Sequence, residues 1–244
     1  MMRFILLLVL IASVSACGRS DLAPVVELKW HPRNSHQSLH RVQRGETLYA
    51  IAFRYDKDFR QVAAYNHLRS PYALRVGQII RLPRSGSVRY TYSAKKAPKP
   101  AQTWARRRST PVAKSTHSWL PRRSGTWQWP AKGRVVSGFV PQQGKKGMDI
   151  AGKKGDKVYA SAAGVVAYAG SGLSGYGNLI IIKHNGQFLT AYGNNSLNRV
   201  KEGQSVKAGQ IIADMGVIDR KFWGVHFEIR KSGQPVNPAD YLSK

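Results

Sequence analysis

Three short blocks in the second half of the chain carry its strongest candidates for chemistry. They read Gly-Lys-Lys-Gly-Met-Asp-Ile at 144–150, Thr-Ala-Tyr-Gly-Asn at 190–194 and Gly-Val-His-Phe-Glu-Ile-Arg at 224–230. Asp149 and His226 are of the residue types that hold zinc, and a catalytic zinc takes about three protein ligands and a water molecule. Two such ligands are too few to hold the metal firmly, so zinc catalysis is not expected from these residues.

In order and spacing, these blocks resemble the lysostaphin-type (LytM) metallopeptidases, which cut peptidoglycan cross-bridges. That family carries His-x-x-x-Asp, Tyr-x-His, and His-x-His followed by Phe-Glu. The resemblance places Lys145, Asn194 and Gly224 where the family has histidines. It therefore implies a degenerate peptidase-like domain that binds no metal, uses no cofactor and is not an enzyme. The groove left by the lost site is expected to dock a partner through six residues: Lys145, Asp149, Asn194, Trp223, Gly224 and His226.

Residues 127–244 are predicted to be mainly β-structure. Apolar and β-branched runs separated by glycine turns predict strands at 156–160, 164–169, 179–184 and 187–192. The resemblance implies the lysostaphin-type fold, which is similar to a duplicated hybrid motif. The glycine turns are also similar to those of biotinyl and lipoyl carrier domains, but no lysine in a carrier-type hairpin is present.

Residues 39–83 predict a small α+β domain with the order strand, helix, helix, strand. Strands are expected at 40–42 and 79–82, and helices with one apolar face at 48–55 and 58–66. The run resembles a LysM domain through Gly45-Glu46-Thr47-Leu48 and Val76-Gly77-Gln78. This resemblance implies binding to the N-acetylglucosamine-containing glycan of peptidoglycan. Six candidate groove residues follow: Gly45, Glu46, Thr47, Leu48, Leu68 and Tyr72.

The N-terminus predicts export. A basic start is followed by an apolar run and by small residues up to position 16, which is typical of a secretory signal peptide. Cys17 is the only cysteine in the chain and resembles the lipidation site of bacterial lipoproteins. Lipid on Cys17 would anchor the protein to a membrane, and Gly18 implies the outer membrane with the protein facing the periplasm. Residues 17–38 are predicted to be a tether, and the alternative is a plain signal peptide cleaved nearby.

Residues 84–126 predict a basic disordered linker. They contain eleven Lys or Arg, no acidic residue and four prolines, within a chain of net charge +27. Such a segment could bind nucleic acid, but export argues against that partner, and no nucleic acid is expected. The accessible polyanions would be peptidoglycan carboxylates and anionic lipids, to which the linker would adhere in a salt-sensitive way.

Taken together, signal peptide, lipidation site, LysM and degenerate LytM domain resemble the NlpD-type envelope lipoproteins. That family activates N-acetylmuramoyl-L-alanine amidases during cell separation and peptidoglycan remodelling. The resemblance implies two partners beside the membrane, namely peptidoglycan and a periplasmic amidase. Two alternatives remain: a peptidoglycan-binding tether without a partner enzyme and, more distantly, a zinc endopeptidase.

Overall fold

The computed structural model describes residues 37–84 and 127–243, and its first four elements follow the order that the sequence predicts. They are β1 (Leu39–Arg41), α2 (Leu48–Arg54), α3 (Phe59–Tyr65) and β2 (Ile79–Arg81). β1 and β2 pair antiparallel, with His40 opposite Ile80. The predicted signal peptide, Cys17, most of the tether and all but the first residue of the basic linker lie outside the described residues.

Side-chain caps start both helices of this small domain. The Thr47 side chain accepts a hydrogen bond from the Ala50 amide at the start of α2, and Asp58 accepts one from the Arg60 amide at the start of α3. Such caps satisfy amides that the first turn of a helix leaves without partners. The Asn66 side chain then exchanges two hydrogen bonds with the backbone of Arg81, each of 2.7 Å. These bonds join the end of α3 to β2.

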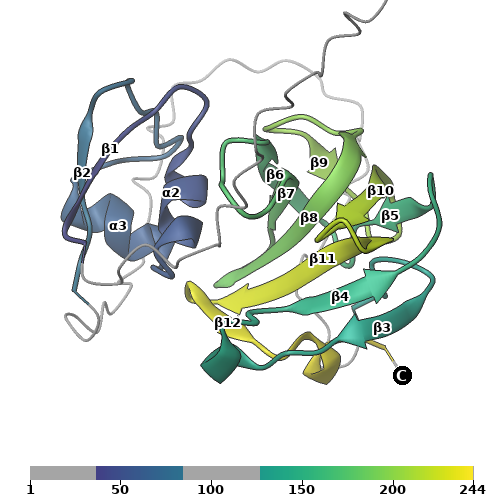
Figure 1. Ribbon diagram of the computed structural model, residues 1–244. Helices are drawn as coiled ribbons and strands as arrows, with labels where there is room; N and C mark the ends of the chain where they lie inside the picture. Colours follow the sequence, from purple (N-terminus) through teal and green to yellow (C-terminus); the bar gives the residue numbers. More distant parts are fainter. Residues whose placement is uncertain (1–36, 85–126, 244) are drawn as a thin grey trace, which may run out of the picture. The chain divides into compact units, whose positions relative to one another are not determined.

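Residues 127–243 form a mainly antiparallel β-domain, as the sequence predicts (Figure 1). Its main sheet has the strand order β3-β4-β11-β10-β8-β7-β6-β9, while β12 pairs with β11 and β5 with β10. The strands are β3 (Arg134–Ser137), β4 (Met148–Ala151), β5 (Lys157–Tyr159), β6 (Gly164–Gly170), β7 (Asn178–Lys183), β8 (Phe188–Asn198), β9 (Ser205–Val206), β10 (Ile211–Ile218), β11 (Phe222–Lys231) and β12 (Gln234–Val236). Two short 3-10 helices, η1 (Pro141–Gln143) and η2 (Pro238–Asp240), complete the domain.

Strand β8 is longer than the sequence predicts. The prediction ends the strand at position 192, whereas β8 continues through Gly193 and two asparagines to Asn198. Asn194 adopts φ 60°, a left-handed conformation that asparagine tolerates better than most residues. The Asn195 side chain donates to the Tyr192 carbonyl at 2.9 Å. This local bond lets the strand continue past the irregular backbone at Asn194.

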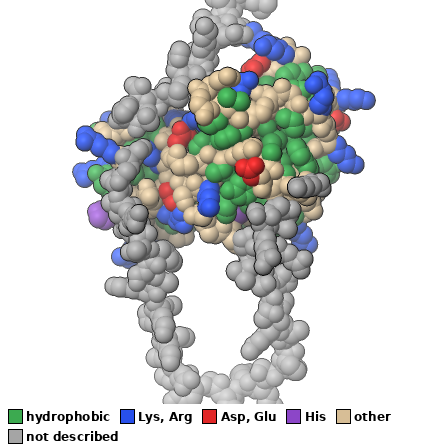
Figure 2. Space-filling view, turned by 90° about the horizontal axis from the view of Figure 1, so that it is seen from below, with side chains coloured by type: hydrophobic (Ala, Val, Ile, Leu, Met, Phe, Trp, Pro, Cys, Tyr) green, Lys and Arg blue, Asp and Glu red, His purple; other side chains and the backbone are tan. Residues whose placement is uncertain are grey.

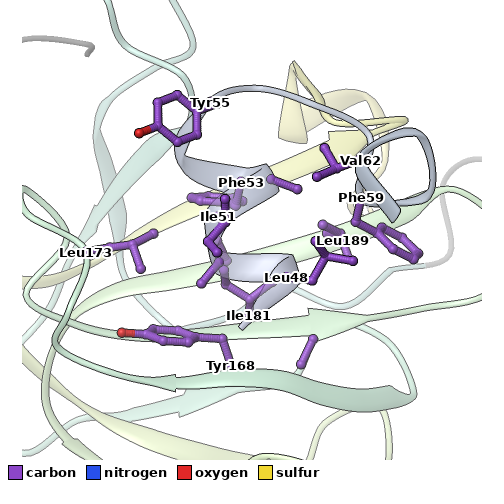
Figure 3. Close-up of a cluster of buried hydrophobic side chains, with 14 of the residues drawn as sticks. Leu48, Ile51, Phe53, Tyr55, Phe59, Val62, Tyr168, Leu173, Ile181 and Leu189 are labelled. Carbon is purple, nitrogen blue, oxygen red and sulfur yellow. The ribbon is translucent and has the colours of Figure 1, made fainter. Parts of the chain in front are cut away.

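Two apolar clusters hold the described residues together, and all of these residues belong to a single compact unit. One cluster fills the β-domain and includes Ile150, Tyr192 and Phe227. In the other, shown in Figure 3, buried side chains of α2 and α3 share a core with side chains of β6, β7 and β8. Its labelled members are Leu48, Ile51, Phe53, Tyr55, Phe59, Val62, Tyr168, Leu173, Ile181 and Leu189. The small helical domain and the β-sheet are therefore packed against each other.

The face in Figure 2 exposes hydrophobic side chains across its middle, with lysine and arginine mostly nearer its edges. In the two described stretches, no helix has both the length and the apolar character needed to cross a membrane.

Candidate functional site

His226 lies where three strands meet. On one side of β11 it is opposite Asp149 of β4, and on the other side it is opposite Gly193 of β8. Because alternate residues of a strand face the same side, His226 shares its face with Glu228 and Arg230. The strand pairing therefore brings together two of the predicted groove residues, Asp149 and His226.

Both ring nitrogens of His226 contact carboxylates. Nδ1 lies 2.6 Å from Oδ1 of Asp149, and Nε2 lies 3.1 Å from Oε1 of Glu228. Burial would lower the pKa of His226, but the hydrogen bonds and charges of the two carboxylates raise that pKa to about 9. A carboxylate can only accept, so this geometry suits an imidazolium that donates from both nitrogens.

Glu228 and Arg230 continue a row of alternating charges. Both oxygens of the buried Glu228 carboxylate are engaged, since Oε1 accepts from the Tyr176 hydroxyl at 2.9 Å and Oε2 accepts from Arg230 Nε at 2.7 Å. Burial raises the pKa of Glu228, but the charges of Arg230 and His226 outweigh it and hold the pKa below its usual range. Glu228 is therefore an anion between two cations.

The row ends in the helical domain. The Arg230 guanidinium lies 4.0 Å from the centre of the Phe53 ring and also pairs with Asp56, which in turn pairs with Lys146. We call the six groups the ionic chain: Asp149, His226, Glu228, Arg230, Asp56 and Lys146. It connects the candidate site in the sheet to the turn between α2 and α3.

This arrangement does not fit a zinc site of the kind that active lysostaphin-type peptidases carry. Zinc binds the lone pair of a neutral imidazole nitrogen, but the carboxylates favour protonation of both His226 nitrogens. Within residues 37–84 and 127–243, no group of three or more His, Cys, Asp or Glu side chains is arranged to hold a metal ion. What the site offers is a fixed set of charges.

The other predicted groove residues are spread around His226. Asn194 and Trp223 line an open pocket of about 410 Å³, together with Val217 and Gly216, and His226 is not part of its lining. Gly224 lies inside the sheet, where a Cβ atom would be 2.5 Å from the Ile150 carbonyl oxygen. Lys145 is exposed in the turn after η1 and pairs through its backbone with Val140. The structure thus groups Asn194 and Trp223 at the pocket and leaves the Lys145 side chain in solvent.

The candidate glycan-binding residues border a second pocket, of about 380 Å³. Glu46, Thr47, Leu48 and Tyr72 line it, whereas Gly45 and Leu68 do not. The Leu48 side chain is fully buried in the shared core, so it supports the pocket from beneath. Glu46 is held by Arg54 at 2.8 Å and His40 at 2.7 Å.

Sequence reasoning missed several residues that the structure brings to these sites. Glu228 and Arg230 follow His226 at intervals of two in an apolar strand, and that period places charges on one face. This signal was present in the sequence. Nothing in the sequence indicated that Asp56 of the helical domain would reach Arg230, because that contact depends on how the two domains pack.

Comparison with known protein families matches two stretches of the chain. Residues 40–83 match the LysM domain, and residues 143–238 match Peptidase family M23. These matches agree with the small helical domain and the mainly-β domain described above.

Two proteins are similar to this chain in sequence over most of its length, and one solved structure is similar over about half of it. A protein named "Lipoprotein NlpD/LppB homolog" from Pseudomonas aeruginosa is 40% identical, covering 95% of this chain and 84% of that one. "Murein hydrolase activator NlpD" from Escherichia coli K12 is 37% identical, covering 86% of this chain and 69% of that one. The solved structure of the antimicrobial peptidase lysostaphin from Staphylococcus simulans has a TM-score of 0.44 at 26% identity, covering 49% of this chain and 53% of that one.

Proposed function

Because the chain belongs to the family of NlpD/LppB lipoproteins, we propose that it is a non-catalytic lipoprotein that binds peptidoglycan and activates N-acetylmuramoyl-L-alanine amidases. It would act in cell separation and peptidoglycan remodelling. The observation that carries this proposal is the similarity to a murein hydrolase activator across 86% of the chain. The LysM match supports the peptidoglycan-binding part.

We place the protein in the cell envelope, anchored in the outer membrane by lipid on Cys17 and facing the periplasm. Residues 1–16 would be removed as a signal peptide, 17–38 would be a tether, and 84–126 would link the two domains 39–83 and 127–244. The relatives named as lipoproteins support an envelope location. Lipidation and the side of the membrane remain our proposals.

The M23 domain acts without catalysis in this proposal. Lys145, Asn194 and Gly224 stand where the lysostaphin-type pattern has histidines, and His226 is committed to two carboxylates. These features support a domain that recognises a partner and does not cleave peptidoglycan. The vestigial groove would bind a segment of the amidase that otherwise blocks the amidase's own active site. This binding would shift the amidase toward its open form.

Two residues of the proposed groove, Asn194 and Trp223, line a pocket with space for part of a partner. Val217 lines it and is 42% exposed, while Ile211 of the same strand is 43% exposed and lies outside it. Filling the pocket with Val217→Trp should weaken activation about tenfold or more, because a central interface position typically contributes 1–3 kcal/mol. Ile211→Trp adds the same bulk elsewhere on β10 and should leave activation unchanged. Murein release by a purified amidase from the same cell, with soluble protein from Gly18 onward, is the measurement.

Other outcomes separate the competing functions. Equal stimulation by wild type and folded Val217→Trp would place the docking surface elsewhere. No stimulation of any amidase, with peptidoglycan binding intact, would favour the tether. One zinc per chain together with release of murein fragments by the protein alone would make it an endopeptidase.

A further inference from the structure

The pocket of about 380 Å³ has two walls that come from different domains. The LysM wall consists of the start of α2, with its cap residue Thr47 and with Tyr49 in its first turn, and the loop after α3, with Tyr72. The opposite wall comes from the M23 domain and includes Val165 of β6, Lys183 of β7, and Glu202 in the turn before β9. The volume of the whole pocket lies in the range of pockets that hold small ligands, about 300–1,000 Å³.

The two walls are fixed to each other by specific contacts. The Thr47 hydroxyl donates to the Ala167 carbonyl of β6 at 3.1 Å, and Arg54 donates to the Gly172 carbonyl at 3.0 Å. Beneath the pocket, Leu48 packs in the same core as Tyr168 and Ile181 (Figure 3). A pocket held in this way loses little entropy when a ligand binds.

The lining combines an apolar surface with separated hydrogen-bonding groups. The rings of Tyr49 and Tyr72 lie 6.0 Å apart, and Val165 is 39% exposed. The Lys183 ammonium lies 5.8 Å from the centre of the Tyr49 ring, and no described carboxylate forms an ion pair with it. Glu202 is exposed, and its carboxylate accepts a long bond, 3.3 Å, from the Ala169 amide.

A sugar ring presents just these two kinds of surface. Its C–H face packs on aromatic and aliphatic side chains, while its hydroxyl and acetamido groups need donors and acceptors at its edge. In the pocket, the LysM tyrosines and Val165 supply the apolar contact, Lys183 supplies a donor and Glu202 an acceptor. Glu46 is less available, because Arg54 and His40 already hold its carboxylate.

We propose that Val165, Lys183 and Glu202 of the M23 domain complete the glycan groove of the LysM domain, so that an N-acetylated amino-sugar chain binds between the two domains. This rests on the proposed peptidoglycan binding and adds to it a second wall outside the LysM domain. Glycan bound to both walls stabilises the packed arrangement of the domains, since a ligand favours the state that it contacts most.

Two pairs of matched variants test the second wall in the soluble protein from Gly18 onward, which contains both domains. Val165→Trp fills the pocket, and Val135→Trp adds the same side chain at another site with 39% exposure, on β3. Lys183→Gln removes the ammonium over Tyr49, and Lys231→Gln removes an ammonium that lies 5.9 Å from the centre of the Phe188 ring, away from the pocket. Two probes are used. Binding of a tetramer of N-acetylglucosamine is measured by calorimetry, and binding to insoluble peptidoglycan is measured by the amount of protein that pellets with it.

Lys183→Gln should weaken binding of the tetramer about tenfold, the loss expected for one hydrogen bond to a charged group. Val165→Trp should also weaken it about tenfold, because the larger side chain occupies the space that the sugar needs. Val135→Trp and Lys231→Gln should bind as the wild type does. Thermal unfolding checks that each variant is folded. If Val165→Trp does not fold, the comparison of Lys183→Gln with its control Lys231→Gln still decides the test. Binding lost in Tyr72→Ala but unchanged in Lys183→Gln and folded Val165→Trp would overturn the second wall and leave a LysM-only site. Absence of binding by the wild type would overturn the proposed peptidoglycan binding as well.

Discussion

At the residue scale, His226 is the clearest case of a side chain whose surroundings determine its chemistry. Its ring is held by Asp149 at 2.6 Å and Glu228 at 3.1 Å. With Arg230 next to Glu228, negative and positive groups alternate along the face of β11. Such a row fixes side-chain positions, and removing one member leaves a buried charge without its partner. The histidine is therefore expected to stabilise the fold.

The pKa of His226 gives this stabilisation a pH dependence. The folded pKa is raised to about 9 from 6.5, so its contribution is fully present below pH 6.5 and is lost as the pH rises through about 9. Near neutral pH, His226→Gln should lower the free energy of unfolding by about 3–5 kcal/mol, as expected when a buried ion pair loses one partner. The difference between wild type and variant, from urea unfolding, should shrink at alkaline pH.

His184 provides the contrasting control. It is buried between the Ala163 carbonyl and the Thr190 hydroxyl, and burial lowers its pKa to about 4. The neutral ring is the stable form in the fold, so the stability linked to His184 falls as the pH drops from 6.5 toward 4.

For the His226→Gln prediction, the contradicting outcome concerns the difference in the free energy of unfolding between wild type and variant. If that difference widens with rising pH, the charged state assigned to His226 is wrong.

At the scale of elements, Thr47 joins a helix to a strand of the other domain. Its oxygen accepts from the Ala50 amide as the cap of α2 and donates to the Ala167 carbonyl of β6, both at 3.1 Å. A hydroxyl can fill both roles at once because it carries a donor and two acceptor sites. The start of α2 and its packing on the sheet are thus fixed by one side chain.

Thr47→Val should lower the free energy of unfolding by about 1–3 kcal/mol, because it removes a helix cap and a hydrogen bond while keeping the shape of the side chain. Thr47→Ser keeps the hydroxyl and serves as the control, with a loss well under that of Thr47→Val. Denaturant unfolding of the soluble protein measures both. Equal stability of the two variants would show that neither hydrogen bond contributes.

At the scale of the whole molecule, the helical domain and the M23 domain share a core and the ionic chain. Tyr168, Leu173, Ile181 and Leu189 of the M23 domain belong to the cluster that α2 completes. Arg230 is almost fully buried and pairs with Asp56. Separating the domains would expose apolar surface and leave Arg230 with one fewer partner.

A fragment that begins at Trp127 should therefore unfold at a lower temperature than the protein that contains both domains. It should also bind a dye specific for exposed apolar surface, because its share of the common core is uncovered. Calorimetry of the longer protein should show one cooperative transition for the two domains. Two separate transitions, with the M23 transition unchanged in the fragment, would show that the shared core contributes no stability.

The sequence by itself determined the two helices and two strands of the small domain and four strands of the M23 domain, β5 to β8. The period of apolar residues at 48–66 predicted both helices, and the β-branched runs at 156–192 predicted strands that the sheet contains. These features are local, since a helix or strand face is set by spacing along the chain. The fold of both domains and the NlpD-type family were therefore predicted correctly, through the resemblance carried by short motifs.

Only the tertiary structure decided what surrounds those motifs. The pairing of β4 with β11 placed Asp149 beside His226, and the packing of α2 on the sheet brought Asp56 to Arg230. The same packing set Lys183 over Tyr49, which are far apart in the sequence. Such contacts depend on which strands pair across the sheet and on how two apolar faces meet, and the spacing of residues within one helix or strand specifies neither.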